Sequence, residues 1–151
     1  MEDNKKYFKR KIYDTMLKWK TERNGDTALM IQGARRIGKS TVAEEFAKRE
    51  YKSYILIDFS KVSKEVSDLF NDVSDLNYLF IRLQFIYHEQ LHERESVIIF
   101  DEVQLQPKAR QAIKHLVKDH RYDYIETGSL ISVRSRSRDI LVPSEETKID
   151  M

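Results

Sequence analysis

Residues 33–40 read GARRIGKS: a glycine, four further residues, and then Gly38-Lys39-Ser40. An apolar run at 27–32 precedes this stretch, and a helical pattern begins at its end. In such a strand–loop–helix arrangement the glycines let the backbone wrap closely, so that successive N–H groups point inward at an anion. The first turn of the following helix adds its positive end. The stretch therefore predicts a phosphate-binding loop; the alternative is a glycine-containing turn with a surface lysine.

ATP with Mg²⁺ is the ligand that this loop predicts. We expect the Lys39 ammonium to reach the β- and γ-phosphates and the Ser40 hydroxyl to coordinate Mg²⁺. GTP is disfavoured, because no NKxD segment follows the apolar run at 122–127. The residues expected to contact the nucleotide are Gly33, Ala34, Arg35, Arg36, Ile37, Gly38, Lys39, Ser40 and Thr41.

Two adjacent carboxylates follow a second apolar run, at 97–100. Ligands of open α/β sheets bind at the carboxyl ends of the strands, which is where Asp101 and Glu102 would lie. We expect Asp101 to hold Mg²⁺ through its water shell, and Glu102 to orient and deprotonate an attacking water. The alternative is that the two carboxylates merely begin a solvated loop.

Two hydroxyl side chains, Thr127 and Ser129, come at the end of the run at 122–127. If this strand lies between those carrying the loop and the carboxylates, a hydroxyl here would point at the γ-phosphate or at the water. We expect this of Thr127 more than of Ser129, because hydroxyls at strand ends commonly cap backbone groups. The predicted catalytic residues are Glu102, Lys39 and Thr127.

Short apolar runs and helical patterns alternate along the whole chain. Strands are expected at 27–32, 53–59, 96–100 and 122–127, with a barely completed fifth at 147–151. Helices are expected at 39–49, 64–71, 76–92 and 107–119. Such runs are typical of buried parallel strands. The alternation predicts an α/β fold, in which helices cover both faces of a parallel sheet of four to five strands.

The first 25 residues have a pattern of their own. Phe8, Ile12, Met16 and Trp19 recur at helical spacing in a Lys/Arg-rich segment, which Asn24-Gly25 closes as a C-terminal cap would. We therefore expect an amphipathic helix over 1–25 and a single phosphate-loop core over 26–151.

Composition sets broad bounds on the class of protein. The 151 residues are the length of one domain, and 27 Lys and Arg against 25 Asp and Glu leave a net charge of +2. This near-balance gives no global argument for nucleic acid or an anionic membrane. No cysteine is present, which excludes a disulfide scaffold. The longest apolar runs are four residues, whereas a membrane helix needs about 20. We expect a cytoplasmic protein without a membrane partner.

Other charged side chains carry weaker signals. Arg134, Arg136 and Arg138 alternate with serine. One of them could serve a neighbouring subunit as an arginine finger, or they could contact nucleic-acid phosphates weakly, but a solvated loop is the favoured interpretation. His88 and His92 lie four apart in one expected helix and could share a metal, yet we favour surface residues because no third ligand is evident.

With these residues in place, the chain resembles the P-loop ATPases of the AAA+ class. The narrower resemblance is to large prokaryotic ATP-binding proteins that begin with an AAA+ core, and it runs from about Lys5 to the end. Its marks are IQGARRIGKS, Asp58-Phe59-Ser60, IIFDEVQ and YIETGSL. The resemblance implies a three-layer fold with sheet order 5-1-4-3-2. It makes Gly33, Gly38, Lys39 and Ser40 the Walker A loop, Asp101 and Glu102 the Walker B pair, and Thr127 the sensor-1 residue.

The resemblance also implies a lid and a further C-terminal domain, whereas this sequence stops at Met151. We interpret the chain as a truncated core without the lid, and expect weak ATP hydrolysis that acts as a switch read by a partner protein or by other copies. The alternatives are a P-loop small-molecule kinase, which would need an acceptor pocket, and a nucleic-acid-binding module regulated by ATP.

Overall fold

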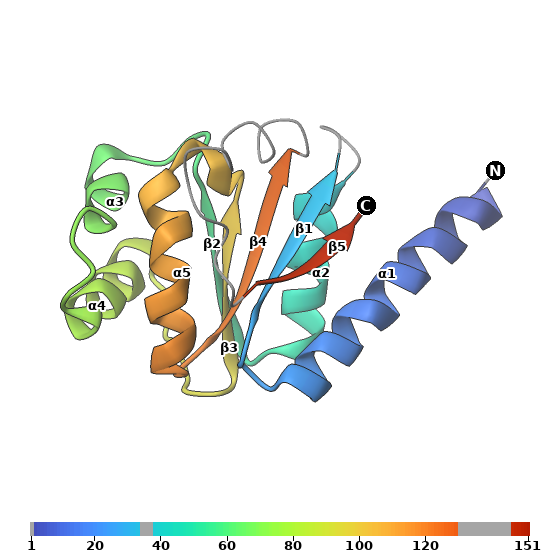
Figure 1. Ribbon diagram of the computed structural model, residues 1–151, viewed down its shortest axis with the longest axis horizontal. Helices are drawn as coiled ribbons and strands as arrows, with labels where there is room; N and C mark the ends of the chain where they lie inside the picture. The colour runs from blue at the N-terminus through green and yellow to red at the C-terminus, as the bar shows by residue number, and fades with distance from the viewer. Residues whose placement is uncertain (1, 34–37, 130–145) are drawn as a thin grey trace.

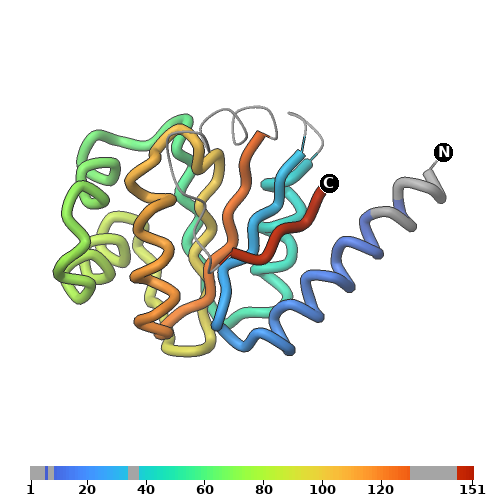
Figure 2. Tube along the Cα trace, in the orientation of Figure 1, coloured from blue at the N-terminus to red at the C-terminus, as the bar shows by residue number. Residues whose placement is uncertain are grey.

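The computed structural model describes the backbone of residues 2–33, 38–129 and 146–151 (Figure 1). Its centre is a sheet of five parallel strands in the order β2-β3-β4-β1-β5 (Figure 2). Read from β5, this is the predicted order 5-1-4-3-2. The strands are β1 (Ala28–Gly33), β2 (Ser53–Asp58), β3 (Ser96–Asp101), β4 (Asp123–Ser129) and β5 (Glu146–Asp150).

Helices cover both faces of this sheet, so the predicted fold class is confirmed (Figure 1). Alternate side chains of β1 point to opposite faces: Met30 joins the core beneath one set of helices, and Leu29 and Ile31 join the other. Because both faces are buried, the strands need near-continuous apolar runs. The helices are α1 (Glu2–Arg23), α2 (Lys39–Glu50), α3 (Lys64–Leu69), α4 (Leu76–Tyr87) and α5 (Pro107–Asp119), with a 3₁₀ turn, η1 (Val103–Leu105), before α5.

The expected N-terminal helix is present as α1, and it packs against the same face as α2. Ile12, Met16 and Trp19 are buried there, and the Trp19 indole N–H donates to the carbonyl oxygen of Thr27 at 3.1 Å. The helix gives way to left-handed backbone at Asn24 (φ 46°) and Gly25 (φ 88°), as the capping pattern predicts. In the described part of the chain, no helix combines the length and apolarity that a membrane crossing requires.

One expected helix is shorter than predicted. The pattern at 76–92 suggested a single helix, but α4 ends at Tyr87 and His88 adopts left-handed backbone. Beyond it, the Ser53 hydroxyl donates to the Gln90 carbonyl oxygen at 2.5 Å, and the His92 N–H donates to Ser96 Oγ at 2.8 Å. These bonds to the first residues of β2 and β3 replace those of another helical turn. His88 and His92 therefore do not share a helix face, and the basis for a metal pair is lost.

Charged side chains are buried between α5 and the strands β4 and β5. Arg110 Nη2 lies 3.2 Å from Glu146 Oε1, and both side chains are buried. Glu126 on β4 is completely buried beside them. Burial raises the pKa of Glu126 well above its usual range, and the neighbouring Glu146 raises it further. Neither carboxyl oxygen of Glu126 has a hydrogen-bond partner among the described residues, whereas the ion pair between Arg110 and Glu146 fastens the edge strand β5 to α5.

Candidate functional site

The sequence-predicted residues gather where the parallel strands end. Gly33 is the last residue of β1 and lies opposite Ser129, the last residue of β4. Asp58 and Asp101 are the final, paired residues of β2 and β3. Figure 1 shows the arrowheads of β1 and β4 side by side at this edge. Parallel strands in register thus bring residues from four distant parts of the sequence to one edge.

The two ends of the predicted phosphate loop are well placed to bind an anion. Gly33 ends β1, and Gly38 has φ 86° at the N-terminus of α2. No atom lies within 4 Å of where a Cβ on Gly38 would sit, so glycine is favoured there by its backbone angle rather than by space. Four predicted contacts, Ala34, Arg35, Arg36 and Ile37, lie outside the described residues, as do Arg134, Arg136 and Arg138.

Lys39 folds back from α2 toward the end of β1. Its side chain is only 5% exposed, and Nζ donates to the Gly33 carbonyl oxygen at 3.2 Å. Ser40 and Thr41 follow in the first turn of the helix, where Ser40 is partly exposed and Thr41 is exposed. The ammonium therefore sits between the strand and the helix that flank the loop, which is where a loop-bound phosphate would need a positive charge.

Thr127 joins the two predicted carboxylate residues. Its hydroxyl donates to Asp101 Oδ1 at 2.6 Å and accepts the backbone N–H of Glu102 at 3.0 Å. Thr127 is fully buried on β4, and β4 lies between β1 and β3, as the order implied by the resemblance has it. The Thr127 hydroxyl thus caps a backbone group, as the alternative interpretation holds, and it also holds Asp101 and Glu102 in place. Direct contact with a phosphate or a water stays a prediction.

Asp101 occupies an electrostatic environment suited to a cation. Burial raises its pKa, the hydrogen bond from Thr127 lowers it, and the nearby Asp58 and Glu102 raise it again. Lys39 lies close enough to lower the pKa of Asp101 as well. Asp58, Asp101 and Glu102 thus bring three carboxylates to this edge of the sheet, with the Lys39 ammonium near Asp101. A divalent cation would relieve their repulsion.

Magnesium is compatible with the oxygen donors that the strand ends supply. Within the described ranges, no group of three or more His, Cys, Asp or Glu side chains is arranged to hold a metal ion. Mg²⁺ is commonly held by one or two protein ligands together with waters and substrate phosphates, so a carboxylate at Asp101 and a hydroxyl at Ser40 suit it without a full protein cage.

Glu102 has an unusual backbone conformation, and its side chain is held by a residue that the sequence did not single out. Its backbone is left-handed (φ 55°), and Gln104 Nε2 donates to Glu102 Oε2 at 2.5 Å. Gln104 is buried, and its own Oε1 has no hydrogen-bond partner among the described residues. The amide therefore orients the carboxylate expected to act as base. The IIFDEVQ block contains Gln104, but a two-residue separation alone does not predict this contact.

Asp58 was noted in the sequence only as part of a motif, without a role. The structure places it in register with Asp101, and the Phe59 N–H donates to the Asp101 carbonyl oxygen at 3.0 Å. Asp58 Oδ1 accepts the backbone N–H and the hydroxyl of Ser60, at 3.0 and 2.5 Å. Its position beside β3 adds a third carboxylate to the site.

Replacing Thr127 by valine should destabilise the protein by about 1–3 kcal/mol, because the Glu102 N–H and Asp101 lose their shared partner inside the protein. Thr127→Ser keeps the hydroxyl and should cost distinctly less. Urea denaturation of both variants gives the free energies of unfolding. Equal stabilities for the two variants would show that the hydroxyl does not hold the carboxylates together.

Comparison with known proteins assigns the chain to a family. No curated protein matches the chain. Among solved structures, the helicase domain of Hef from Pyrococcus furiosus is similar at 12% identity, with a TM-score of 0.41, over 95% of this chain but only 37% of that one. The model of the AAA domain family matches residues 25–148, from the end of α1 into β5. The chain belongs to the AAA domain family.

Proposed function

We propose that this protein binds ATP with Mg²⁺ at the carboxyl ends of β1, β3 and β4 and hydrolyses it, with the nucleotide state acting as a switch. The observation that carries the proposal is the bridge made by Thr127. From β4, which lies between β3 and the β1 strand that leads into the phosphate loop, Thr127 fixes the Asp101 carboxylate and the Glu102 backbone at the end of β3. A carboxylate pair held beside a lysine and a helix N-terminus suits the transfer of a phosphoryl group to water.

Phosphate binding would rest on the loop between Gly33 and Gly38 and on Lys39. The first backbone N–H groups of α2 have no partners within the helix and carry a partial positive charge. Lys39, now bonded to the Gly33 carbonyl oxygen, would turn its ammonium to the β- and γ-phosphates.

Asp101 and Ser40 would hold the cation. The Ser40 hydroxyl lies in the first turn of α2, and Asp101 ends β3. When bound, Mg²⁺ supplies positive charge that neutralises charge developing on the phosphates. The hydrogen bond from Thr127 restricts the Asp101 carboxylate, so its orientation does not depend on the cation.

Glu102 would accept a proton from the attacking water. Gln104 holds its Oε2 and the left-handed backbone fixes the direction in which the side chain leaves the strand. The rate gain would come from positioning and from charge stabilisation rather than from a covalent intermediate. A partner protein, or another copy of the chain, would read the difference between the ATP and ADP states.

Titration with fluorescent ATP, ADP and GTP, with and without Mg²⁺, tests the proposal. ATP and ADP should bind, GTP should bind more weakly, and Mg²⁺ should strengthen ATP binding. Phosphate should then appear slowly in the absence of any added acceptor. ATP binding without phosphate release would favour the small-molecule kinase alternative, and absence of nucleotide binding would refute both.

A further inference from the structure

One helix of the protein leaves a row of large apolar side chains exposed. Tyr78, Ile81 and Phe85 of α4 are 56%, 63% and 66% exposed, and their spacing places them along one face. The opposite face of α4 is buried through Leu79, Phe80 and Leu83. Among the described residues, the one other exposed large apolar side chain is Leu105, which is 46% exposed. Single exposed apolar residues are ordinary, whereas a continuous row marks a binding surface.

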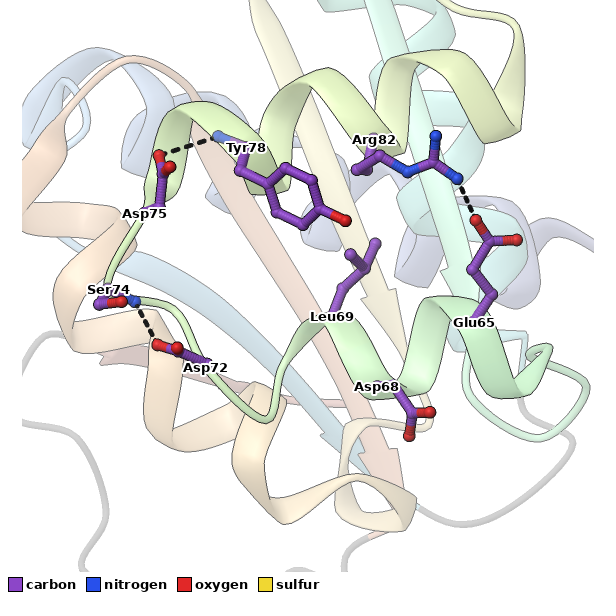
Figure 3. A pocket seen from close by; sticks show the side chains of 8 residues that line it. All are labelled: Glu65, Asp68, Leu69, Asp72, Ser74, Asp75, Tyr78 and Arg82. Carbon is purple, nitrogen blue, oxygen red and sulfur yellow. Dashed lines mark hydrogen bonds and ion pairs between the residues drawn. The ribbon is translucent and has the colours of Figure 1, made fainter.

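This row borders a groove between α3 and α4. The groove encloses about 530 Å³, and Leu69 from α3 and Tyr78 from α4 line it together with Arg82 (Figure 3). Arg82 lies within the same arc of α4 as the exposed apolar residues, so the groove and the row form one surface. We call this surface the α3–α4 groove.

Acidic side chains dominate the α3–α4 groove. Its lining includes four carboxylates, from Glu65, Asp68, Asp72 and Asp75, and one cation, Arg82, which pairs with Glu65. Lys64 approaches Asp68 at 3.4 Å but is almost fully exposed. Asp72 and Asp75 accept backbone N–H groups from Ser74 and Tyr78, which keeps them fixed along the rim. Hydrogen bonds from Ser74 lower the pKa of Asp72.

A second copy of this chain does not fit the surface. Two α4 helices packed together would match their apolar rows but would bring two sets of carboxylates close, which is unfavourable. The basic helix α1 has the right charge, yet the exposed side chains of its described part are polar or charged, for example Lys9, Arg10 and Lys18. Neither surface supplies both cations and apolar side chains.

We propose that the α3–α4 groove binds a basic amphipathic helix of another protein. Apolar side chains at positions i, i+3 or i+4, and i+7 of that helix would cover Tyr78, Ile81 and Phe85, and Lys or Arg beside them would meet Asp68, Asp72 and Asp75. The apolar row gives affinity by burial, and the carboxylates select the charge of the partner. This inference concerns residues outside the nucleotide site and does not depend on the proposed hydrolysis.

A labelled Leu/Lys amphipathic peptide of about 18 residues, long enough to form a helix on a surface, serves as the probe. Fluorescence anisotropy should show that it binds the protein. The same peptide with Glu in place of Lys, and a scrambled peptide of the same composition, should bind much more weakly.

Variants locate the binding. Ile81→Ser with Phe85→Ser should weaken binding about tenfold or more, the scale of losing buried apolar area, and Leu105→Ser is the matched control. Asp68→Asn with Asp72→Asn should weaken it about fivefold, the scale of two exposed charge pairs. Asp14→Asn with Glu22→Gln removes the same charge from α1 and should leave binding unchanged. All of these side chains are exposed, and circular dichroism checks that each variant is folded.

Three outcomes would overturn the proposal. The first is equal binding of the basic and acidic peptides, or no binding of either. The second is an equal loss in the control variants, which would mean attraction to the protein's overall charge. The third is self-association of the parent that Ile81→Ser abolishes in sedimentation, which would make a second copy the occupant.

Discussion

Lys39→Ala should remove ATP binding, with affinity falling on the order of 10³-fold, because a charge-assisted contact to two phosphates disappears. Lys39 is the one predicted phosphate ligand whose side chain the structure describes as buried and directed back to the end of β1. Its bond to the Gly33 carbonyl oxygen would also be lost, so the free energy of unfolding should fall by about 1 kcal/mol. Fluorescent-ATP titration and urea denaturation measure the two effects.

Lys48→Ala is the matched control, because Lys48 lies on the same helix with an exposed side chain. It should leave ATP affinity unchanged. If Lys39→Ala binds ATP as tightly as the parent and has a native circular dichroism spectrum, the phosphate-loop assignment is wrong.

Glu102→Gln should lower phosphate release by roughly 10²-fold while keeping or tightening ATP binding, because a general base is lost without a change of shape. The glutamine carbonyl oxygen can still accept the hydrogen bond from Gln104 Nε2, so the side chain should keep its orientation. Single-turnover phosphate release, measured beside ATP affinity, separates the chemical step from binding.

Two further variants sharpen this result. Asp101→Asn should change the Mg²⁺ dependence of ATP binding, which Glu102→Gln should not. Glu89→Gln, at an exposed position beyond α4, controls for loss of a carboxylate elsewhere. If Glu102→Gln hydrolyses ATP as fast as the parent, Glu102 is not the base.

The strands could be predicted closely because both faces of the sheet are buried. Near-continuous apolar runs such as 97–100 leave little choice of structure, and β3 spans the expected residues with Asp101 added at its end. The resemblance supplied the order of the strands. The end of α4 could not be predicted from the local pattern, because the segment after it is held by hydrogen bonds to Ser53, which is distant in the sequence, and to Ser96, the first residue of β3.

Buried polar contacts, in the site and in the core, were harder to predict from the sequence than the strands. Glu126 sits in a strand with a mixed pattern and gives no sign in the sequence of being completely buried. Its environment is made by Arg110 and Glu146, 36 residues apart on α5 and β5. The contact of Gln104 with Glu102 could likewise not be predicted, because it depends on the turn after β3 that brings the Gln104 amide to the Glu102 carboxylate. Contacts of this kind depend on tertiary packing, which local patterns do not encode.

The left-handed backbone of Glu102 implies a compromise between folding and chemistry. A glutamate in this region costs on the order of 1–2 kcal/mol relative to the right-handed alternatives, a cost that glycine largely avoids. Selection for folding alone would thus favour glycine, or asparagine, at this position. A search for more stable variants of this protein should therefore recover such replacements at 102, and each gain in stability there would remove the carboxylate proposed to activate water.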